Sequence, residues 1–240
     1  MRKQATPVLE LRGVSMVYRN ERIETHALRR VDLAVHAGEF VAVTGPSGSG
    51  KTTLLSIAGL LESASGGAVL IGGEDYSGRS DRERSECRNR KLGFVFQSFH
   101  LIPELDLLGN VELPLRYRGL PARDRRRRAE AALGMVGLGL RMDEFPAQLS
   151  GGQQQRAAIA RALVGEPVLL LADEPTGSLD SAMAQGILEL LERLNDRGCT
   201  IVMATHDPVL AARATRRVRL RDGAIVPAPM RAPAVAPVPA

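Results

Sequence analysis

Short apolar runs alternate with amphipathic stretches along most of this chain. Strands that are buried on both faces read as continuous apolar runs. Runs of this kind lie at 41–45, 69–73, 92–96, 168–173 and 200–206. Between them, the segments 52–61 and 183–194 carry apolar residues at helical spacing. The alternation predicts an α/β fold with a mainly parallel sheet that is covered by helices.

Three regions differ from this pattern. The segments 8–18 and 31–45 are typical of antiparallel strands beside the core, and the segment 98–158 has helical periodicity without a strong strand. We therefore expect one domain over residues 7–226, with 98–158 as an inserted helical lobe. Residues 227–240 are almost wholly Pro, Ala and Val. That composition predicts an extended or disordered tail.

Charge and hydropathy narrow the classes of protein. The 240 residues carry a formal net charge of +5. A charge this small does not require a nucleic-acid partner, so we expect none. No apolar run approaches the roughly 20 residues that span a bilayer, and the start of the chain lacks the apolar core of a signal peptide. These features predict a cytoplasmic protein.

The sharpest basic cluster is the run Arg125–Arg128. Ala129, Ala132, Leu133 and Val136 follow it at helical spacing, which directs most of the arginines toward the solvent face of a helix. Contact with a membrane surface or an acidic partner is the alternative interpretation.

A glycine-rich loop, GPSGSGKT, follows the apolar run at 41–45. It fits the pattern G-x-x-x-x-G-K-[ST], with Gly45, Gly50, Lys51 and Thr52 at the fixed positions. The glycines let backbone N–H groups surround phosphate oxygens, and the next helix adds the positive end of its dipole. Lys51 supplies a charge for the β- and γ-phosphates, and Thr52 supplies a hydroxyl for Mg²⁺. The loop therefore predicts a nucleotide site.

Two carboxylates end the apolar run at 168–173. A charge at the end of a buried strand is costly unless a cation meets it. Asp173 is therefore predicted to hold Mg²⁺, directly or through water, beside the glycine-rich loop. Glu174 is predicted to orient the attacking water or to accept its proton.

The stretch LSGGQQQR, at Leu149–Arg156, is far more restricted in occurrence than the glycine-rich loop. In combination with Gly45–Thr52 and Asp173-Glu174, it resembles the nucleotide-binding subunit of an ATP-binding cassette (ABC) transporter. The resemblance covers roughly residues 8–226. It implies a P-loop NTPase (RecA-like) core with an antiparallel β subdomain and an inserted α-helical subdomain.

The resemblance also implies a head-to-tail homodimer. Two ATP molecules would lie between the P-loop of one subunit and the LSGGQ motif of the other. The residues agree with this arrangement, because Ser150 can cap the helix that follows and Gly151 and Gly152 expose N–H groups at its start. The start of this helix is therefore a second anion site, and an ATP molecule bound to a monomer would not need it. Leu149 is expected to be a packing residue with no chemical role.

Further roles rest on the match alone. Gln97 resembles the glutamine that senses the γ-phosphate and Mg²⁺, and His206 resembles the switch histidine that contacts the γ-phosphate. Asp180 resembles the aspartate at the dimer interface. Tyr18 lies where the family places an aromatic that stacks on adenine, although an ordinary strand aromatic is the alternative.

The predicted site combines catalytic residues, Mg²⁺ ligands and residues that contact ATP. Its catalytic residues are Glu174, His206 and Gln97, and its Mg²⁺ ligands are Thr52, Gln97 and Asp173. The residues predicted to contact ATP are Tyr18, Gly45, Pro46, Ser47, Gly48, Ser49, Gly50, Lys51, Thr52, Thr53, Ser150, Gly151, Gly152, Gln153 and Asp180.

The segments 94–115 and 172–180 resemble the lipoprotein-release and macrolide-efflux (LolD/MacB-like) branch of the family. This resemblance implies an ATPase that lies on the inner face of the cytoplasmic membrane and drives a separate permease with a periplasmic domain. The permease is expected to dock beside the segment after Gln97. The expected contacts are Phe99, Leu101, Ile102 and Leu105. An FtsE-like transmembrane signalling ATPase that transports nothing is the alternative.

Two other classes fit the sequence less well. Soluble ABC ATPases that act on DNA or ribosomes usually carry two cassettes or a long coiled-coil insertion, and this sequence has neither. Small GTPases select guanine with an N-K-x-D motif, which is not found, and neither they nor nucleotide kinases use an LSGGQ motif.

Overall fold

The computed structural model of the chain describes residues 6–20 and 23–226. The expected tail at 227–240 lies outside these residues. No helix in the described part is long and apolar enough to cross a membrane.

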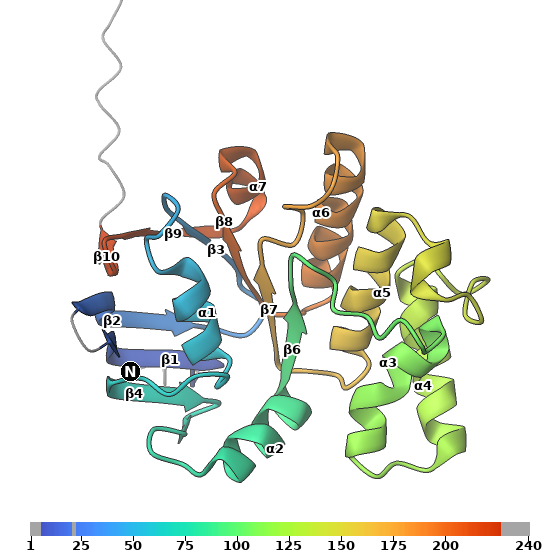
Figure 1. Cartoon of the computed structure of the whole chain (residues 1–240), viewed down its shortest axis with the longest axis horizontal. Helices are drawn as coiled ribbons and strands as arrows, with labels where there is room; N and C mark the ends of the chain where they lie inside the picture. The colour runs from blue at the N-terminus through green and yellow to red at the C-terminus, as the bar shows by residue number, and fades with distance from the viewer. Residues whose placement is uncertain (1–5, 21–22, 227–240) are drawn as a thin grey trace, which may run out of the picture.

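A six-stranded sheet forms the centre of the molecule, in the order β10–β9–β3–β8–β7–β6 (Figure 1). The strands are β3 (Phe40–Thr44), β6 (Leu92–Val95), β7 (Leu169–Asp173), β8 (Ile201–Thr205), β9 (Arg216–Arg221) and β10 (Ala224–Val226). The first five are parallel, and β10 pairs antiparallel with β9. Every residue of β8 is buried, as a continuous apolar run predicts. The predicted α/β class with a P-loop NTPase core is confirmed.

A second sheet is antiparallel, in the order β2–β1–β4–β5. Its strands are β1 (Leu9–Asn20), β2 (Ile23–Val35), β4 (Gly66–Ile71) and β5 (Glu74–Asp75). Two expectations need correction here. The run at 69–73 enters this sheet through β4 and does not join the parallel one, and the segment 31–45 is divided between β2 and β3. Burial alone cannot predict strand direction, because Val69, Leu70 and Ile71 are as well buried as the parallel strands.

The large sheet carries a separate hydrophobic core on each face. Val41 and Val43 of β3 point into the core shared with the antiparallel sheet, whereas Phe40 and Ala42 point into the core shared with the helical lobe. The helices α1 (Lys51–Ala58) and α2 (Asp81–Lys91) pack on the first face, and α6 (Ser181–Asp196) and α7 (Pro208–Arg213) pack on the second.

The inserted lobe consists of α3 (Leu107–Tyr117), α4 (Ala122–Met135), a short 3₁₀ helix (Pro146–Gln148) and α5 (Gly151–Leu163). Figure 1 shows the lobe beside β6, on the side away from α1. The described residues between 98 and 158 contain no strand, in agreement with the predicted helical subdomain. Leu149 is buried in the core of the lobe, as a packing residue should be. The exact domain boundaries at 7 and 226 stay predictions.

The arginine run lies on α4, and its guanidinium groups are paired with carboxylates. Arg125 contacts Glu112 at 3.3 Å, and Arg126 contacts Glu130 at 2.9 Å. The other two pairs are Arg127 with Asp124 and Arg128 with Glu166. The opposite side of α4 buries alanine and leucine, so the spacing predicted its orientation correctly. These four arginines therefore form ion pairs at the surface of the lobe.

Candidate nucleotide-binding site

Four neighbouring parallel strands bring the predicted site residues to one edge of the sheet. The loop Gly45–Thr52 follows β3, and His206 follows β8. Asp173 is the last residue of β7 and Glu174 comes directly after it, while Gln97 lies in the loop after β6. The carboxyl ends of parallel strands share one edge, so residues far apart in sequence meet there. This edge is the usual ligand position in an open α/β sheet.

The glycine-rich loop connects β3 to α1 and places Lys51 inside it. The Lys51 ammonium group donates to the carbonyls of Gly45 at 2.9 Å and Pro46 at 3.0 Å. Gly50 has a φ of 100°, and a Cβ there would lie 2.5 Å from the Ala27 carbonyl oxygen. Glycine is therefore required at this position. Phosphate oxygens are stronger acceptors for an ammonium group than neutral carbonyls, so the loop has the chemistry to bind them.

Asp173 provides a test of whether the site fits Mg²⁺. Its Oδ1 atom is buried and has no hydrogen-bond partner among the described residues. Burial raises the pKa of this carboxyl, whereas Thr52 and Lys51 beside it lower the pKa. A buried carboxylate oxygen next to a hydroxyl is the donor chemistry that Mg²⁺ prefers, so the residues fit. Bound Mg²⁺ would offset the negative charge of phosphate oxygens at this edge.

Gln97, the third predicted ligand, lies further from the sheet in an exposed loop. A Cβ on Gly177 would lie 2.9 Å from its amide carbon, so the Gln97 side chain rests against the loop after β7. The Ser178 hydroxyl also donates to the Gln97 carbonyl at 2.9 Å. The two loops are therefore held together within one chain.

Glu174 and His206 form a direct pair. Nδ1 of His206 lies 2.9 Å from Oε1 of Glu174. The backbone of Glu174 has a φ of 45°, and its N–H donates to the Ala204 carbonyl in β8. A left-handed backbone is strained for a residue with a side chain, and such strain is often found at functional sites. The strand pairing thus fixes a carboxylate next to an imidazole at the edge where the P-loop lies.

The LSGGQ motif forms the start of α5. The Ser150 hydroxyl accepts from the Gln153 N–H at 3.4 Å, and the Gln153 side chain accepts from the Ser150 N–H at 2.9 Å. This reciprocal capping box gives Gln153 a structural role that the sequence analysis missed, although the S-x-x-Q spacing signals it. A Cβ on Gly152 would lie 3.2 Å from the Met183 sulfur, so this glycine also permits close packing on α6.

The two predicted phosphate sites of one chain lie in different parts of the molecule. Figure 1 shows α1, which begins in the P-loop, on one side of β7 and β6 and α5 on the other. A single nucleotide in the P-loop of one chain would therefore leave the start of α5 free for a second molecule.

Tyr18 and Asp180 both have structural partners. The Tyr18 hydroxyl donates to Glu62 at 2.7 Å, and the residue is 40% exposed. That contact fixes the ring at the surface near α1, where stacking on a base is possible. Asp180 caps α6 by accepting from the Met183 N–H at 2.9 Å. Its predicted place at a dimer interface is compatible with this cap because the residue is exposed.

Two polar residues of α5 that the sequence analysis did not single out hold the loop around Gln97. Gln155 is fully buried and donates to the carbonyls of Phe96 and Pro175. Arg161 donates to the carbonyls of Phe99 and His100, two consecutive residues with left-handed backbone. Polar side chains within the buried, alanine-rich part of α5 are the signal that could have found them. The helix that begins with LSGGQ is thereby tied to the loop that carries Gln97.

Comparisons with known proteins agree with this geometry. Residues 28–177 match the ABC transporter family. The chain is 51% identical over 218 residues to an uncharacterized ABC transporter ATP-binding protein of Thermotoga maritima, covering 91% of this chain and 93% of that protein. It is 48% identical over 220 residues to the macrolide export ATP-binding/permease protein MacB of Nitrobacter winogradskyi, covering 92% of this chain but only 34% of that protein.

A solved structure is similar throughout the fold. The dimeric structure of the bacterial ABC transporter cassette MJ0796 has a TM-score of 0.83 and 43% sequence identity, and the match covers 90% of this chain and 96% of that one. A second structure of the same cassette, in a post-hydrolysis state with ADP and Pi, matches with the same TM-score of 0.83.

Proposed function

The chain belongs to the ABC transporter family, and on that premise we propose that it binds and hydrolyses ATP to drive a separate membrane permease. The observation that best supports hydrolysis is the 2.9 Å contact between Glu174 and His206. It lies at the edge of the parallel sheet where Lys51 and Asp173 also lie. Lys51 binds the β- and γ-phosphates, and Asp173 and Thr52 hold Mg²⁺. Glu174 orients water and accepts its proton, and His206 keeps the carboxylate in position.

The active form is a head-to-tail homodimer with two ATP molecules between the chains. Support comes from the separation of the P-loop and the start of α5 within one chain (Figure 1). Two-fold symmetry lets each chain supply the P-loop to one ATP and Ser150 to the other. The similar cassette MJ0796 is described as dimeric, which is the same assembly class.

The membrane partner is a permease of the export or lipoprotein-release type with a periplasmic domain. Support comes from the MacB relatives, whose name includes a permease and of which this chain matches about a third. The chain would then lie on the inner face of the cytoplasmic membrane. The segment after Gln97 joins the proposed γ-phosphate sensor to the lobe. A permease that docks beside this segment would therefore contact a part of the chain whose position depends on the bound nucleotide. Of the expected contacts there, Leu101 packs against the lobe core.

Glu174→Gln tests the proposed site and the dimer together. Removing the proton acceptor should stop hydrolysis but keep ATP binding, so ATP should trap a dimer that light scattering detects. Ser150→Arg in the same background is the matched variant, because it blocks the anion site on α5 and leaves the P-loop intact. We expect ATP binding without a dimer. A dimer that still forms would remove the LSGGQ motif from the interface, and a monomer in both variants would reject the dimer.

A further inference from the structure

The end of strand β1 is attached to the segment that follows α1. The Ser65 N–H donates to the Ser15 carbonyl at 2.9 Å, and the Val17 N–H donates to the Ser65 hydroxyl at 3.0 Å. Glu62 lies in the same segment, and its N–H donates to the Ser56 carbonyl of α1 at 3.3 Å. The position of this segment is therefore set by the helix that begins in the P-loop.

The pairing of β1 with β2 is irregular just before Tyr18. The register shifts between Val14 and Met16 and again between Met16 and Val17. Irregularities of this kind bend a strand and redirect the side chains near them. The Tyr18 hydroxyl donates to Oε2 of Glu62 at 2.7 Å. The aromatic side chain is therefore held against the segment after α1.

The hydroxyl of Tyr18 lies between two side chains. Burial raises the pKa of Tyr18 and the Glu62 carboxylate raises it further, whereas Thr53 lowers it. The hydroxyl is therefore protonated at neutral pH and can donate to Glu62. Thr53 belongs to the first turn of α1, directly after Lys51 and Thr52. The same short helix thus contacts the aromatic side chain and carries the residues that bind phosphate and Mg²⁺.

Strand β2 connects the other side of this hairpin to the P-loop. A Cβ on Gly50 would lie 2.5 Å from the Ala27 carbonyl oxygen and 3.1 Å from the Leu28 side chain. Tyr18 is paired with Thr25, which lies shortly before these two residues in β2. The hairpin is therefore attached at two points, to the P-loop through β2 and to the segment after α1 through Tyr18. These attachments fix the separation between the ring and the phosphate-binding loop.

We propose that Glu62 is a positioning residue for the adenine base and that it acts through the hydroxyl of Tyr18. This proposal rests on the ATP-binding function, with Tyr18 as the aromatic that stacks on the base. Tyr18 is 40% exposed, and a partly exposed side chain loses conformational freedom when a ligand binds it. The hydrogen bond to Glu62 restricts the ring before the base arrives, so less freedom is lost on binding. In this role Glu62 contacts Tyr18 and not the nucleotide.

Calorimetric titration of the full chain with ADP and with pyrophosphate separates the base from the phosphates. Both ligands suit the P-loop, but only ADP carries a base. We expect Glu62→Ala and Tyr18→Phe each to weaken ADP binding by about five-fold, as for the loss of one hydrogen bond. Pyrophosphate binding should not change. The double variant should bind ADP as well as either single variant does, because both substitutions remove the same contact.

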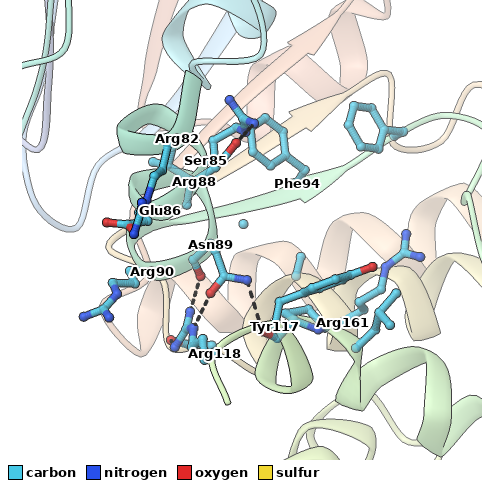
Figure 2. A pocket seen from close by; sticks show the side chains of 17 residues that line it. Arg82, Ser85, Glu86, Arg88, Asn89, Arg90, Phe94, Tyr117, Arg118 and Arg161 are labelled. Atoms are coloured by element: carbon cyan, nitrogen blue, oxygen red, sulfur yellow. Dashed lines mark hydrogen bonds and ion pairs between the residues drawn. The ribbon is translucent and has the colours of Figure 1, made fainter. Parts of the chain in front are cut away.

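Glu62→Gln and Tyr117→Phe are the controls. Glutamine keeps an oxygen that accepts from the Tyr18 hydroxyl, so Glu62→Gln should bind ADP as the wild type does. Tyr117 is 79% exposed on α3 in the helical lobe (Figure 2), and the loss of its hydroxyl should change neither affinity. Thermal unfolding shows whether each variant is folded.

Three results would overturn the proposal: additive losses in the double variant, equal losses for ADP and pyrophosphate, or unchanged ADP binding in Glu62→Ala. GDP tests a direct contact with the base. Stacking tolerates every base, so a positioning role predicts the same loss for GDP as for ADP. A loss confined to ADP would place Glu62 on the adenine amino group and reject action through Tyr18. A wild-type chain that binds neither ADP nor pyrophosphate would instead contradict the P-loop function, so the two failures are distinguishable.

Discussion

The P-loop edge of the sheet and the start of α5 are both predicted phosphate sites, but their polar groups are satisfied to different degrees. At the P-loop edge, Asp173 Oδ1 and Ser49 Oγ are buried without a hydrogen-bond partner in the part of the chain described. At α5, Ser150 and Gln153 satisfy each other through the capping box. The P-loop edge therefore contains buried polar atoms that need a ligand, whereas at the start of α5 Ser150 is exposed to solvent and its hydroxyl only accepts within the capping box.

The difference predicts an order of binding. An unsatisfied buried polar group costs roughly 1–3 kcal/mol, so a ligand that satisfies it gains that amount. A phosphate at Ser150 relieves no such cost, because Ser150 is exposed and solvated before the phosphate binds. We therefore expect a single chain to bind ATP through the P-loop, and the α5 site to be used only when a partner chain delivers the phosphate with the rest of its interface.

Glu174→Gln should show the largest effect on the P-loop edge. We expect hydrolysis to fall by about a thousand-fold because the general base is lost, with little change in ATP affinity. Phosphate release at saturating ATP and calorimetric titration measure the two quantities. Asp143→Asn, at an exposed carboxylate in the lobe, should leave both unchanged. A wild-type rate for Glu174→Gln would show that this residue is not the base.

Lys51→Ala should weaken ATP binding itself. Charge-assisted hydrogen bonds contribute roughly 1.5–3 kcal/mol, which corresponds to a loss of affinity of about 10- to 100-fold. Calorimetric titration measures the affinity. Because Lys51 also holds the carbonyls of Gly45 and Pro46, thermal unfolding must show that the variant is folded. A folded variant with unchanged affinity would contradict the P-loop assignment.

Two substitutions at Ser150 separate capping from phosphate binding. Ser150→Ala should lower the free energy of unfolding by about 1 kcal/mol because the cap is lost. Ser150→Asp keeps an acceptor for the cap, but its charge repels phosphate, so stability should be retained and the ATP-trapped dimer lost. Denaturant unfolding and light scattering in the Glu174→Gln background measure the two. A stable dimer in Ser150→Asp would rule out a phosphate at this position.

The smallest expected effect concerns the pH dependence of stability without nucleotide, which Asp173→Asn should change. The folded-state pKa of Asp173 is raised, with burial as the first cause. Protonation therefore favours the folded state, and the free energy of unfolding should fall as pH rises from the ordinary aspartate pKa through the raised one. Without nucleotide, Asp173→Asn should remove this fall and be the more stable protein at neutral pH. A variant whose stability depends on pH as the wild type does would contradict the raised pKa of a buried Asp173 carboxyl.

The sequence could place the P-loop, Gln97, Glu174 and His206 at one edge of the sheet because each of them follows a buried strand. Apolar runs located β3, β6, β7 and β8, and the ends of these strands carry Lys51, Gln97, Glu174 and His206. The pairing of strands that are distant in the chain was harder to predict from the sequence. Nothing in the run at 69–73 indicates an antiparallel neighbour, so the pairing of β4 with β1 in the second sheet could not be predicted.

Contacts between side chains and distant backbone were not predictable from spacing. Gln155 and Arg161 donate to carbonyls that are distant in the chain, in the loops after β6 and β7, and only the folded chain brings these carbonyls to α5. The cavity lined by Arg82, Phe94, Pro114 and Arg161 (Figure 2) likewise combines residues of α2, β6, α3 and α5, which come together only in the folded chain.

The position of β3 has a consequence for how the protein is made. Its two neighbours in the sheet are β8 and β9, both from the last part of the chain, although the P-loop follows β3 directly. During synthesis, β3 leaves the ribosome long before either neighbour exists, and such distant pairings are slow to form. Competence to bind ATP should therefore appear only after residues 201–221 have emerged. The nucleotide would then act as a late check on folding and stabilise only chains that have completed the sheet.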